Sequence, residues 1–178
     1  MNITVYLASS DGNMPALAGA AAELGSWIAE SGDTLIYGGS KSGLMGVLAE
    51  SALKKGGRVI GIEPQIFVDA GYVYDEISEL IVTKNMTERK TGMIKLGDAF
   101  IAFPGGTGTL EEISEVMSLV SLRWLDAPCI LYNLGGYYEG LRTLLEKMKE
   151  TGLSSEEKLS GIYFADSLDE IKKIIKEK

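Results

Sequence analysis

The sequence predicts an α/β fold, in which a doubly wound, mostly parallel sheet of about seven strands carries helices on both faces. Short apolar runs alternate with amphipathic segments of helical length from one end of the chain to the other. Strands that alternate with helices form βαβ units, whose parallel strands are covered on both faces. No repeat, linker or low-complexity tract interrupts this alternation, so we expect residues 1–178 to form a single domain.

The predicted strands are short apolar runs rich in β-branched and aromatic residues. In chain order they are ITVYLAS (3–9), TLIYGG (34–39), RVIGIEP (58–64), ELIVTK (79–84), AFIAFPG (99–105), APCILYN (127–133) and GIYFAD (161–166). The amphipathic segments between them predict helices at 14–31, 43–55, 86–97, 109–124, 137–151 and 168–177. Residues 65–78 break the alternation and are interpreted as a longer excursion.

Composition and charge exclude several classes of function. The 178 residues carry a formal net charge of −8, which argues against a nucleic-acid partner because such proteins usually present a basic stripe. An anionic small molecule would need backbone N–H groups and one or two placed cations. The chain has no histidine, so imidazole bases and HExxH zinc sites are excluded and carboxylates, Lys, Tyr or Cys must move protons.

Cysteine content and hydropathy indicate where the protein works. Cys129 is the one cysteine, so neither a disulfide nor a thiolate metal site is expected, which fits a reducing cytoplasm. The first residues lack the cationic start and long apolar core of a signal peptide, and no apolar run reaches transmembrane length. We therefore expect a cytoplasmic protein without a membrane partner.

Ligands of open parallel sheets bind where the carboxyl ends of the strands meet the following loops. One such loop, YGGSKSGLMG (37–46), has glycines that permit unusual dihedral angles and close approach of a ligand. Its spacing matches neither GxGxxG nor GxxxxGK[ST]. A binding loop and a tight strand-to-helix turn therefore remain equally open interpretations.

A second loop, PGGTGTLEE (104–112), combines bare glycine backbone with threonine hydroxyl groups. A helix beginning near Thr109 would point its positive end at the loop, a favourable site for a phosphate. In the alternative interpretation, Thr109 and Glu112 form a T-x-x-E capping box, and an acidic first turn is ordinary. The local pattern alone leaves a phosphate site with a catalytic acid and a helix cap both open.

A third segment, MTERK (86–90), places Arg89 and Lys90 in the first half of a predicted helix. Cations there interact unfavourably with the helix dipole, which indicates that they serve a function. Arginine is the natural bidentate partner of a phosphate or carboxylate, so this function could be ligand binding. The alternative is an exposed basic pair beside Glu88.

The order of these motifs closely resembles the LOG family, the cytokinin-activating nucleoside 5′-monophosphate phosphoribohydrolases. The resemblance runs from residue 3 to about residue 140 and depends above all on MxxRK together with PGGxGTxxE. It implies a Rossmann-like fold, a homodimer, and cleavage of the N-glycosidic bond of AMP or an N6-substituted AMP without a metal or redox cofactor. Some members carry an older lysine decarboxylase label, but nothing in this sequence supports a pyridoxal-phosphate site.

The resemblance also implies the residues of the site. Carried over by motif, the catalytic pair is Arg89 and Glu112. The residues expected to hold the nucleotide are Ser9, Ser10, Gly39, Ser42, Gly43, Met45, Lys90, Gly105, Gly106, Thr107, Gly108, Thr109 and Ser118. Residues 118–122 read SLVSL where plant-type members carry TWxQL, so the preferred base stays open.

Two other functions remain open at this stage. A nucleotide or phosphorylated-cofactor carrier would need the phosphate loop but no carboxylate beside the sugar. A regulatory or structural dimer could use the apolar face of helix 109–124, although a core position is the default for that face. The apolar side chains concerned are Ile113, Val116, Met117, Val120 and Trp124.

Overall fold

The structure, a computed structural model, describes residues 1–177 and is built on a seven-stranded parallel sheet. Its strands are β1 (Asn2–Tyr6), β2 (Thr34–Tyr37), β3 (Arg58–Pro64), β4 (Glu79–Thr83), β5 (Ala99–Ala102), β6 (Cys129–Tyr132) and β7 (Ile162–Ala165). Its helices are α1 (Leu17–Glu30), α2 (Gly43–Lys54), α3 (Gln65–Asp69), α4 (Met86–Leu96), α5 (Thr107–Ser121), α6 (Glu139–Glu150), α7 (Glu156–Leu159) and α8 (Leu168–Lys176), with a 3-10 turn at Leu134–Gly136. The predicted fold class is confirmed.

The strand order β4-β3-β2-β1-β5-β6-β7 reverses direction at the centre of the sheet. The chain winds outward from β1 to β4, then returns to place β5 on the other side of β1. The loops after β1 and β5 therefore leave the sheet in opposite directions, which opens a crevice between them. This topological switch point is where a doubly wound sheet binds its ligand.

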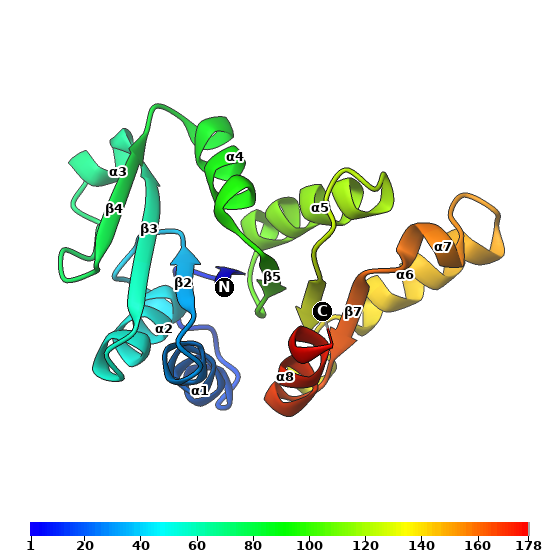
Figure 1. The fold of residues 1–178 in the computed structure, drawn as a ribbon, viewed down its shortest axis with the longest axis horizontal. Coiled ribbons are helices and arrows are strands. Elements are labelled where there is room, and N and C mark those ends of the chain that lie inside the picture. The colour runs from blue at the N-terminus through cyan, green and yellow to red at the C-terminus, as the bar shows by residue number, and fades with distance from the viewer. Residues whose placement is uncertain (178) are drawn as a thin grey trace.

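Two apolar cores fill the space on the two faces of the sheet. Figure 1 shows α1, α2 and α8 on one face and α4 and α5 on the other. Alternate residues of the strands serve alternate cores: Ile3 and Val5 of β1 pack with the first set of helices, and Tyr6 packs with the second. Because both faces are covered, the strands read as the continuous apolar runs from which they were predicted.

The predicted elements are all present, but the loops start earlier than the apolar runs suggested. The first strand ends at Tyr6 and the fifth at Ala102, so the residues that follow them, 7–9 and 103–105, form loops although they are apolar or small. The excursion at 65–78 begins with α3, and the short helix α7 was not predicted. Among the described residues, no helix is long and apolar enough to cross a membrane.

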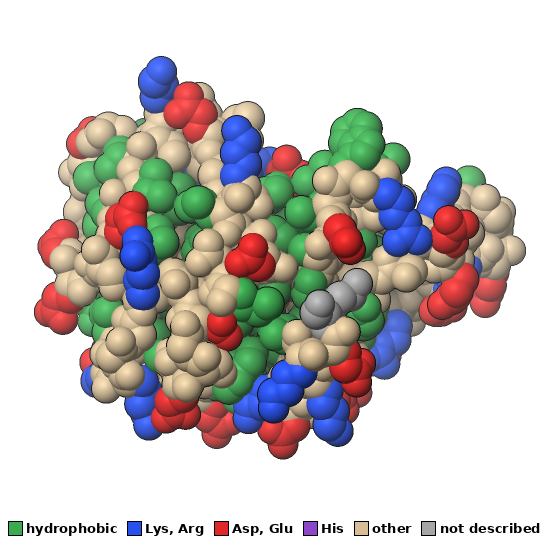
Figure 2. Space-filling model, viewed as in Figure 1, with side chains coloured by type: hydrophobic (Ala, Val, Ile, Leu, Met, Phe, Trp, Pro, Cys, Tyr) green, Lys and Arg blue, Asp and Glu red, His purple; other side chains and the backbone are tan. Residues whose placement is uncertain are grey.

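The predicted bounds of helix 109–124 were wrong at both ends. The helix α5 begins at Thr107 and ends at Ser121, and its N-cap is Gly106 in extended conformation. Glycine at the N-cap lets the backbone turn tightly out of β5, so the helix starts two residues before the capping-box pattern. Leu122 and Trp124 follow the helix and are exposed, and Figure 2 shows a hydrophobic protrusion over that end of α5.

Candidate active site

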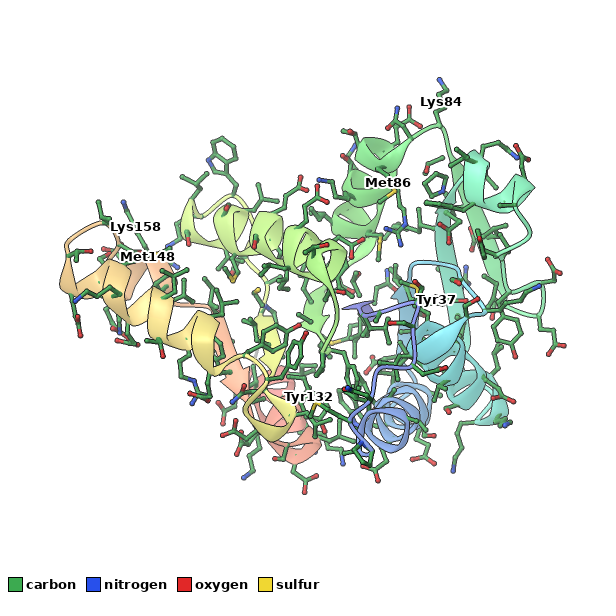
Figure 3. The ribbon with its side chains drawn as sticks, turned by 180° about the vertical axis from the view of Figure 1, so that it is seen from behind. Tyr37, Lys84, Met86, Tyr132, Met148 and Lys158 are labelled. Atoms are coloured by element: carbon green, nitrogen blue, oxygen red, sulfur yellow. The ribbon has the colours of Figure 1, made fainter. Side chains whose placement is uncertain are left out.

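Two adjoining cavities lie at the switch point, at the carboxyl ends of the strands. The larger, about 500 Å³, is lined by Ser9, Ser40, Ser42, Met45, Glu63, Phe67, Tyr72 and Arg89. The smaller, about 290 Å³, is lined by Leu7, Ala8, Ser9, Ser10, Met45, Met86, Arg89, Gly106, Thr107, Gly108, Thr109, Glu111 and Glu112. Ser9, Met45 and Arg89 belong to both, so the two cavities form one continuous cleft. In Figure 3, Met86 marks the start of α4 beside it and Tyr37 the end of β2.

The smaller cavity faces the N-terminus of α5. The first hydrogen bond into that helix is donated by Leu110 N to the Gly106 carbonyl. The amides of Thr107, Gly108 and Thr109 precede it, so they have no acceptor within the helix, and all three residues line the cavity. Three free amides at the positive end of a helix form a cradle for a phosphate group.

Two tyrosines fix the loop that leads into this cradle. The hydroxyl of Tyr138 donates to the Phe103 carbonyl at 2.8 Å, and the hydroxyl of Tyr137 donates to the Gly105 carbonyl at 2.5 Å. A Cβ on Gly105 would collide with the Thr109 side chain, so glycine is required for the turn to close on the helix. Thr109 itself is 4% exposed and lies inside the helix, so the alternative interpretation of Thr109 as the helix cap is wrong.

The other glycine loop, before α2, has a different role. The first amides of α2 are already used: Met45 N donates to the Ala8 carbonyl at 3.2 Å and Leu44 N donates to the Ser10 carbonyl at 3.4 Å. Gly43 has φ +55°, and a Cβ there would collide with the Ser9 carbonyl. This loop thus forms a tight turn, and the amides of Leu44 and Met45 anchor the loop after β1, while its role as a binding loop stays a prediction. It contributes the Met45 and Ser42 side chains to the cleft wall.

Arg89 and Glu112 meet in the floor of the cleft as a buried ion pair. Arg89 Nη1 donates to Glu112 Oε1 at 2.6 Å, and each side chain is only 7% exposed. Arg89 Nε also donates to the Ile62 carbonyl at 2.9 Å, while Gly38 leaves room for the guanidinium, since a Cβ there would collide with Nη2. The interpretation of Arg89 as part of an exposed basic pair is therefore wrong.

The segment before Arg89 explains its position. The Asn85 side chain caps α4 by accepting from Glu88 N at 2.9 Å, and the Glu88 carboxylate accepts from Lys84 N at 3.0 Å. These two bonds fix the first turn of α4, from which Arg89 projects across the end of β3. Lys90 projects elsewhere and pairs with Glu111 at 2.7 Å and Glu115 at 3.2 Å.

Burial and the arginine act in opposite directions on Glu112. Burial raises the pKa of its carboxyl group, and the adjacent Arg89 guanidinium lowers it, with a net effect above the ordinary value. Arg89 therefore opposes the tendency of this buried carboxyl group to take up a proton. Hydrogen bonds to Glu111 and Glu115 raise the pKa of Lys90, which keeps that ammonium group charged.

Glu63 is a cleft residue that the sequence analysis missed. It is the last residue but one of β3, it is 4% exposed, and burial raises the pKa of its carboxyl group to about 7. Arg89 lowers that pKa and Glu112 raises it. The available signal was a lone carboxylate that follows the apolar run VIGI (59–62) near the end of the predicted strand.

The structure brings together most of the predicted site residues, but not all of them. The cleft is lined by ten: Ser9, Ser10, Ser42, Met45, Arg89, Gly106, Thr107, Gly108, Thr109 and Glu112. Gly39 and Gly43 lie behind its wall, Gly105 behind the cradle, and Lys90 beside it. Ser118 lies further along α5 with its hydroxyl donating to the Ser114 carbonyl, so its predicted contact with the nucleotide stays a prediction.

Metal and thiol chemistry have little support within the described residues. No group of three or more Cys, Asp or Glu side chains there is placed to hold a metal ion. Cys129 is fully buried in β6, and burial raises the pKa of its thiol, which keeps it protonated.

Comparison with known proteins identifies the family. A family model described as "Possible lysine decarboxylase" matches residues 45–175. The cytokinin riboside 5′-monophosphate phosphoribohydrolase LOG1 of Arabidopsis thaliana is 37% identical over 171 residues, which cover 96% of this chain and 80% of that protein. The chain belongs to the LOG family. A member from Rhodococcoides fascians with the same phosphoribohydrolase name is 40% identical over 146 residues, or 82% of this chain and 74% of that protein.

Solved structures share the fold of this LOG-family chain. The molybdenum cofactor binding protein of Rippkaea orientalis has a TM-score of 0.71 and 24% identity, with 99% of this chain and 95% of that one covered. The molybdenum cofactor carrier protein of Chlamydomonas reinhardtii has a TM-score of 0.72 and 20% identity, with 99% and 98% covered. At this identity the likeness establishes the architecture only.

Proposed function

We propose that this protein hydrolyses the N-glycosidic bond of a nucleoside 5′-monophosphate, AMP or an N6-substituted AMP, to the free base and ribose 5-phosphate. Relatives named as phosphoribohydrolases support the reaction class. The observation that carries the proposal is the buried Arg89–Glu112 pair, which adjoins the amide cradle of α5. A binding protein needs such a cradle, whereas a buried carboxylate beside it is what glycoside cleavage requires.

The shape of the cleft supports one orientation of the substrate. The phosphate would accept from the amides of Thr107, Gly108 and Thr109, with hydroxyl groups of Ser9 and Ser10 nearby. The base would extend past Arg89 into the larger cavity, where aromatic side chains offer stacking surfaces. The ribose would then lie at the junction of the two cavities, over the ion pair.

Glu112 would carry the chemistry at the sugar. Cleavage of an N-glycoside passes through an oxocarbenium-like state, and a carboxylate next to the anomeric carbon stabilises that positive charge or activates the attacking water. Both roles need the ionised form. Arg89 favours that form, because removal of its positive charge would leave the burial penalty on Glu112 unopposed.

The proposal is tested by Glu112→Gln, assayed by chromatography of free base released from a panel of nucleoside monophosphates. Gln keeps the size of the side chain and removes the charge, so we expect kcat to fall about 100-fold or more. Glu50→Gln, an exposed carboxylate of α2 paired with Lys54, is the matched control and should retain activity. Hydrolysis by Glu112→Gln at the wild-type rate would remove its catalytic role.

A carrier function is the second candidate, and the same panel distinguishes it. The amide cradle and the 500 Å³ cavity would suffice to hold a nucleotide or a phosphorylated cofactor without cleaving it. Tight binding of one compound with no free base from any of them would assign the protein as a carrier.

We also propose that a second copy of the chain covers an apolar surface beside the cleft. The surface has two apolar groups at opposite ends of α5: Leu110, Tyr137 and Leu141 next to the cradle, and Leu122 and Trp124 after the last residue of the helix. Trp124 is 77% exposed and Leu122 is 56% exposed, which is costly for a chain that stays alone in water. Because Gly106 and Thr107 line both this surface and the cleft, a homodimer would also narrow access to the phosphate site.

A further inference from the structure

Glu63 is the buried titratable group for which the proposed chemistry at the sugar has no use. It lines the larger cavity together with Arg89, Phe67 and Tyr72. The residue is 4% exposed, and what remains accessible of it lines this cavity. A carboxyl group held at low exposure against a cavity wall loses much of its hydration, so its presence there calls for a reason.

The backbone around Glu63 makes space for this side chain. Gly39, at the end of the neighbouring strand, has φ +86°, and a Cβ built there would lie 3.2 Å from both the Glu63 Cβ and its Oε2. Any larger residue at this position would push the carboxyl group from its place. The Tyr37 hydroxyl, on which the charge of Glu63 acts, is buried with no hydrogen-bond partner within the described residues.

Glu63 lines the cavity in which the base, the leaving group of the proposed reaction, would lie. A nucleotide whose phosphate occupies the amide cradle has its base in the larger cavity, because the two cavities join at Arg89. Glu112 lines the cradle side of that junction and Glu63 lines the base side. The two carboxyl groups therefore flank the glycosidic bond from its two ends.

We propose that Glu63 is the general acid of this reaction, whose carboxyl group contacts the purine ring and protonates it as the base departs. The inference rests on the proposed function. As the C1′–N9 bond breaks, its electron pair stays with the base, and a ring nitrogen of the base takes the Glu63 proton. Water adds to C1′ and gives its proton to Glu112, and exchange with solvent returns both carboxyl groups to their starting states. The base leaves neutral, which is the function of an acid in glycoside cleavage.

Burial raises the pKa of both carboxyl groups, but only Glu112 has a hydrogen bond from Arg89. Burial raises the pKa of Glu63 to about 7, so much of the group is protonated at neutral pH. Glu112 instead has the direct ion pair with Arg89, which favours its ionised form. Two other groups face Glu63: Tyr37 of β2, whose own pKa is raised, and the ring of Tyr72 across the cavity.

The test is the pH dependence of kcat in the wild type and in Glu63→Gln. The wild type should lose kcat as pH rises above about 7, because the acid must be protonated. Gln fills the same space and can hydrogen-bond the base but cannot release a proton. We therefore expect kcat about 100-fold lower, KM within a few-fold, and no decline near pH 7. Glu50→Gln should keep both the rate and the profile.

Several outcomes would overturn the assignment. A Glu63→Gln enzyme with kcat within 3-fold of wild type, or with a change in KM alone, would make Glu63 a binding or structural residue. A uniform loss of kcat that keeps the decline near pH 7 would do the same. Should the variant fail to fold, a flat wild-type kcat between pH 6 and 8.5 is by itself sufficient to reject the acid. Failure of the wild type on every nucleotide would reject the proposed function instead.

Discussion

The buried ion pair offers a sharp test of the electrostatics of the site, through the substitution Arg89→Met. Met keeps the apolar stem and removes the guanidinium, so Glu112 loses its 2.6 Å partner while staying 7% exposed. The Ile62 carbonyl also loses the donor that lies 2.9 Å away. The perturbation thus leaves one carboxylate and one carbonyl buried without their partners.

The expected loss of stability is large and depends on pH. Removal of one member of a buried pair costs about 3–5 kcal/mol when the other must stay charged. Without Arg89, the folded-state pKa of Glu112 rises further above its unfolded value, so the native state holds the proton more tightly than the unfolded chain. The variant therefore keeps most of its stability at acid pH and loses it as pH rises through that folded pKa. We expect a loss of about 1–2 kcal/mol at pH 5, where a neutral carboxyl group remains, and about 3–5 kcal/mol at pH 8.

Urea unfolding at both pH values measures this difference. With an m-value of about 2 kcal/mol/M, the midpoint at pH 8 should fall by about 1.5–2.5 M. The double variant Arg89→Met/Glu112→Gln contains neither charge of the pair and should recover part of the loss at pH 8 but not at pH 5. A loss for Arg89→Met that is the same at both pH values, or below about 1 kcal/mol at pH 8, would refute the idea that Arg89 compensates a buried negative charge.

Two further predictions concern packing and assembly. A Cβ on Gly25 of α1 would collide with the Leu48 carbonyl of α2, so Gly25→Ala should cost about 1–3 kcal/mol in urea unfolding. Gly19 of the same helix faces open space, and Gly19→Ala should instead add up to about 1 kcal/mol. If a second copy covers the apolar surface, sedimentation should give a dimer for the wild type and a monomer for Trp124→Glu. A wild-type monomer at micromolar concentration would contradict the dimer.

The sequence predicted the fold, and it predicted loops that the structure brings to one cleft, because both follow from short-range patterns. Apolar runs between amphipathic segments specify a parallel sheet, and such a sheet brings its ligand loops to one edge. The start of α5 was harder to predict. The T-x-x-E pattern at Thr109 favours a cap, but a glycine N-cap at Gly106 and the burial of Thr109 outweigh it. Local capping preferences are worth about 1 kcal/mol, which tertiary packing easily exceeds.

The sequence also could not predict which charged side chains are buried. The segment around Arg89 is polar enough to be a surface turn, and only the approach of α4 to the end of β3 buries it. Glu63 is the converse case. Its place in a predicted strand identifies it as buried, but the sequence cannot show whether another side chain pairs with its carboxyl group. Which carboxylate is paired and which stands alone depends on side-chain packing between elements that are distant in sequence.

The site also explains how a chain of net charge −8 can hold an anion. The two basic residues nearest the cradle are already engaged, Arg89 with Glu112 and Lys90 with Glu111. Under the proposed function, attraction of the phosphate would therefore depend on neutral donors, the first amides of α5 and nearby hydroxyl groups, together with the helix dipole. Because fixed dipoles act only at short range, such a cleft would favour a phosphate that fits against the backbone and would give little attraction to extended polyanions. An acidic chain is thus compatible with the small mononucleotide substrate that we propose.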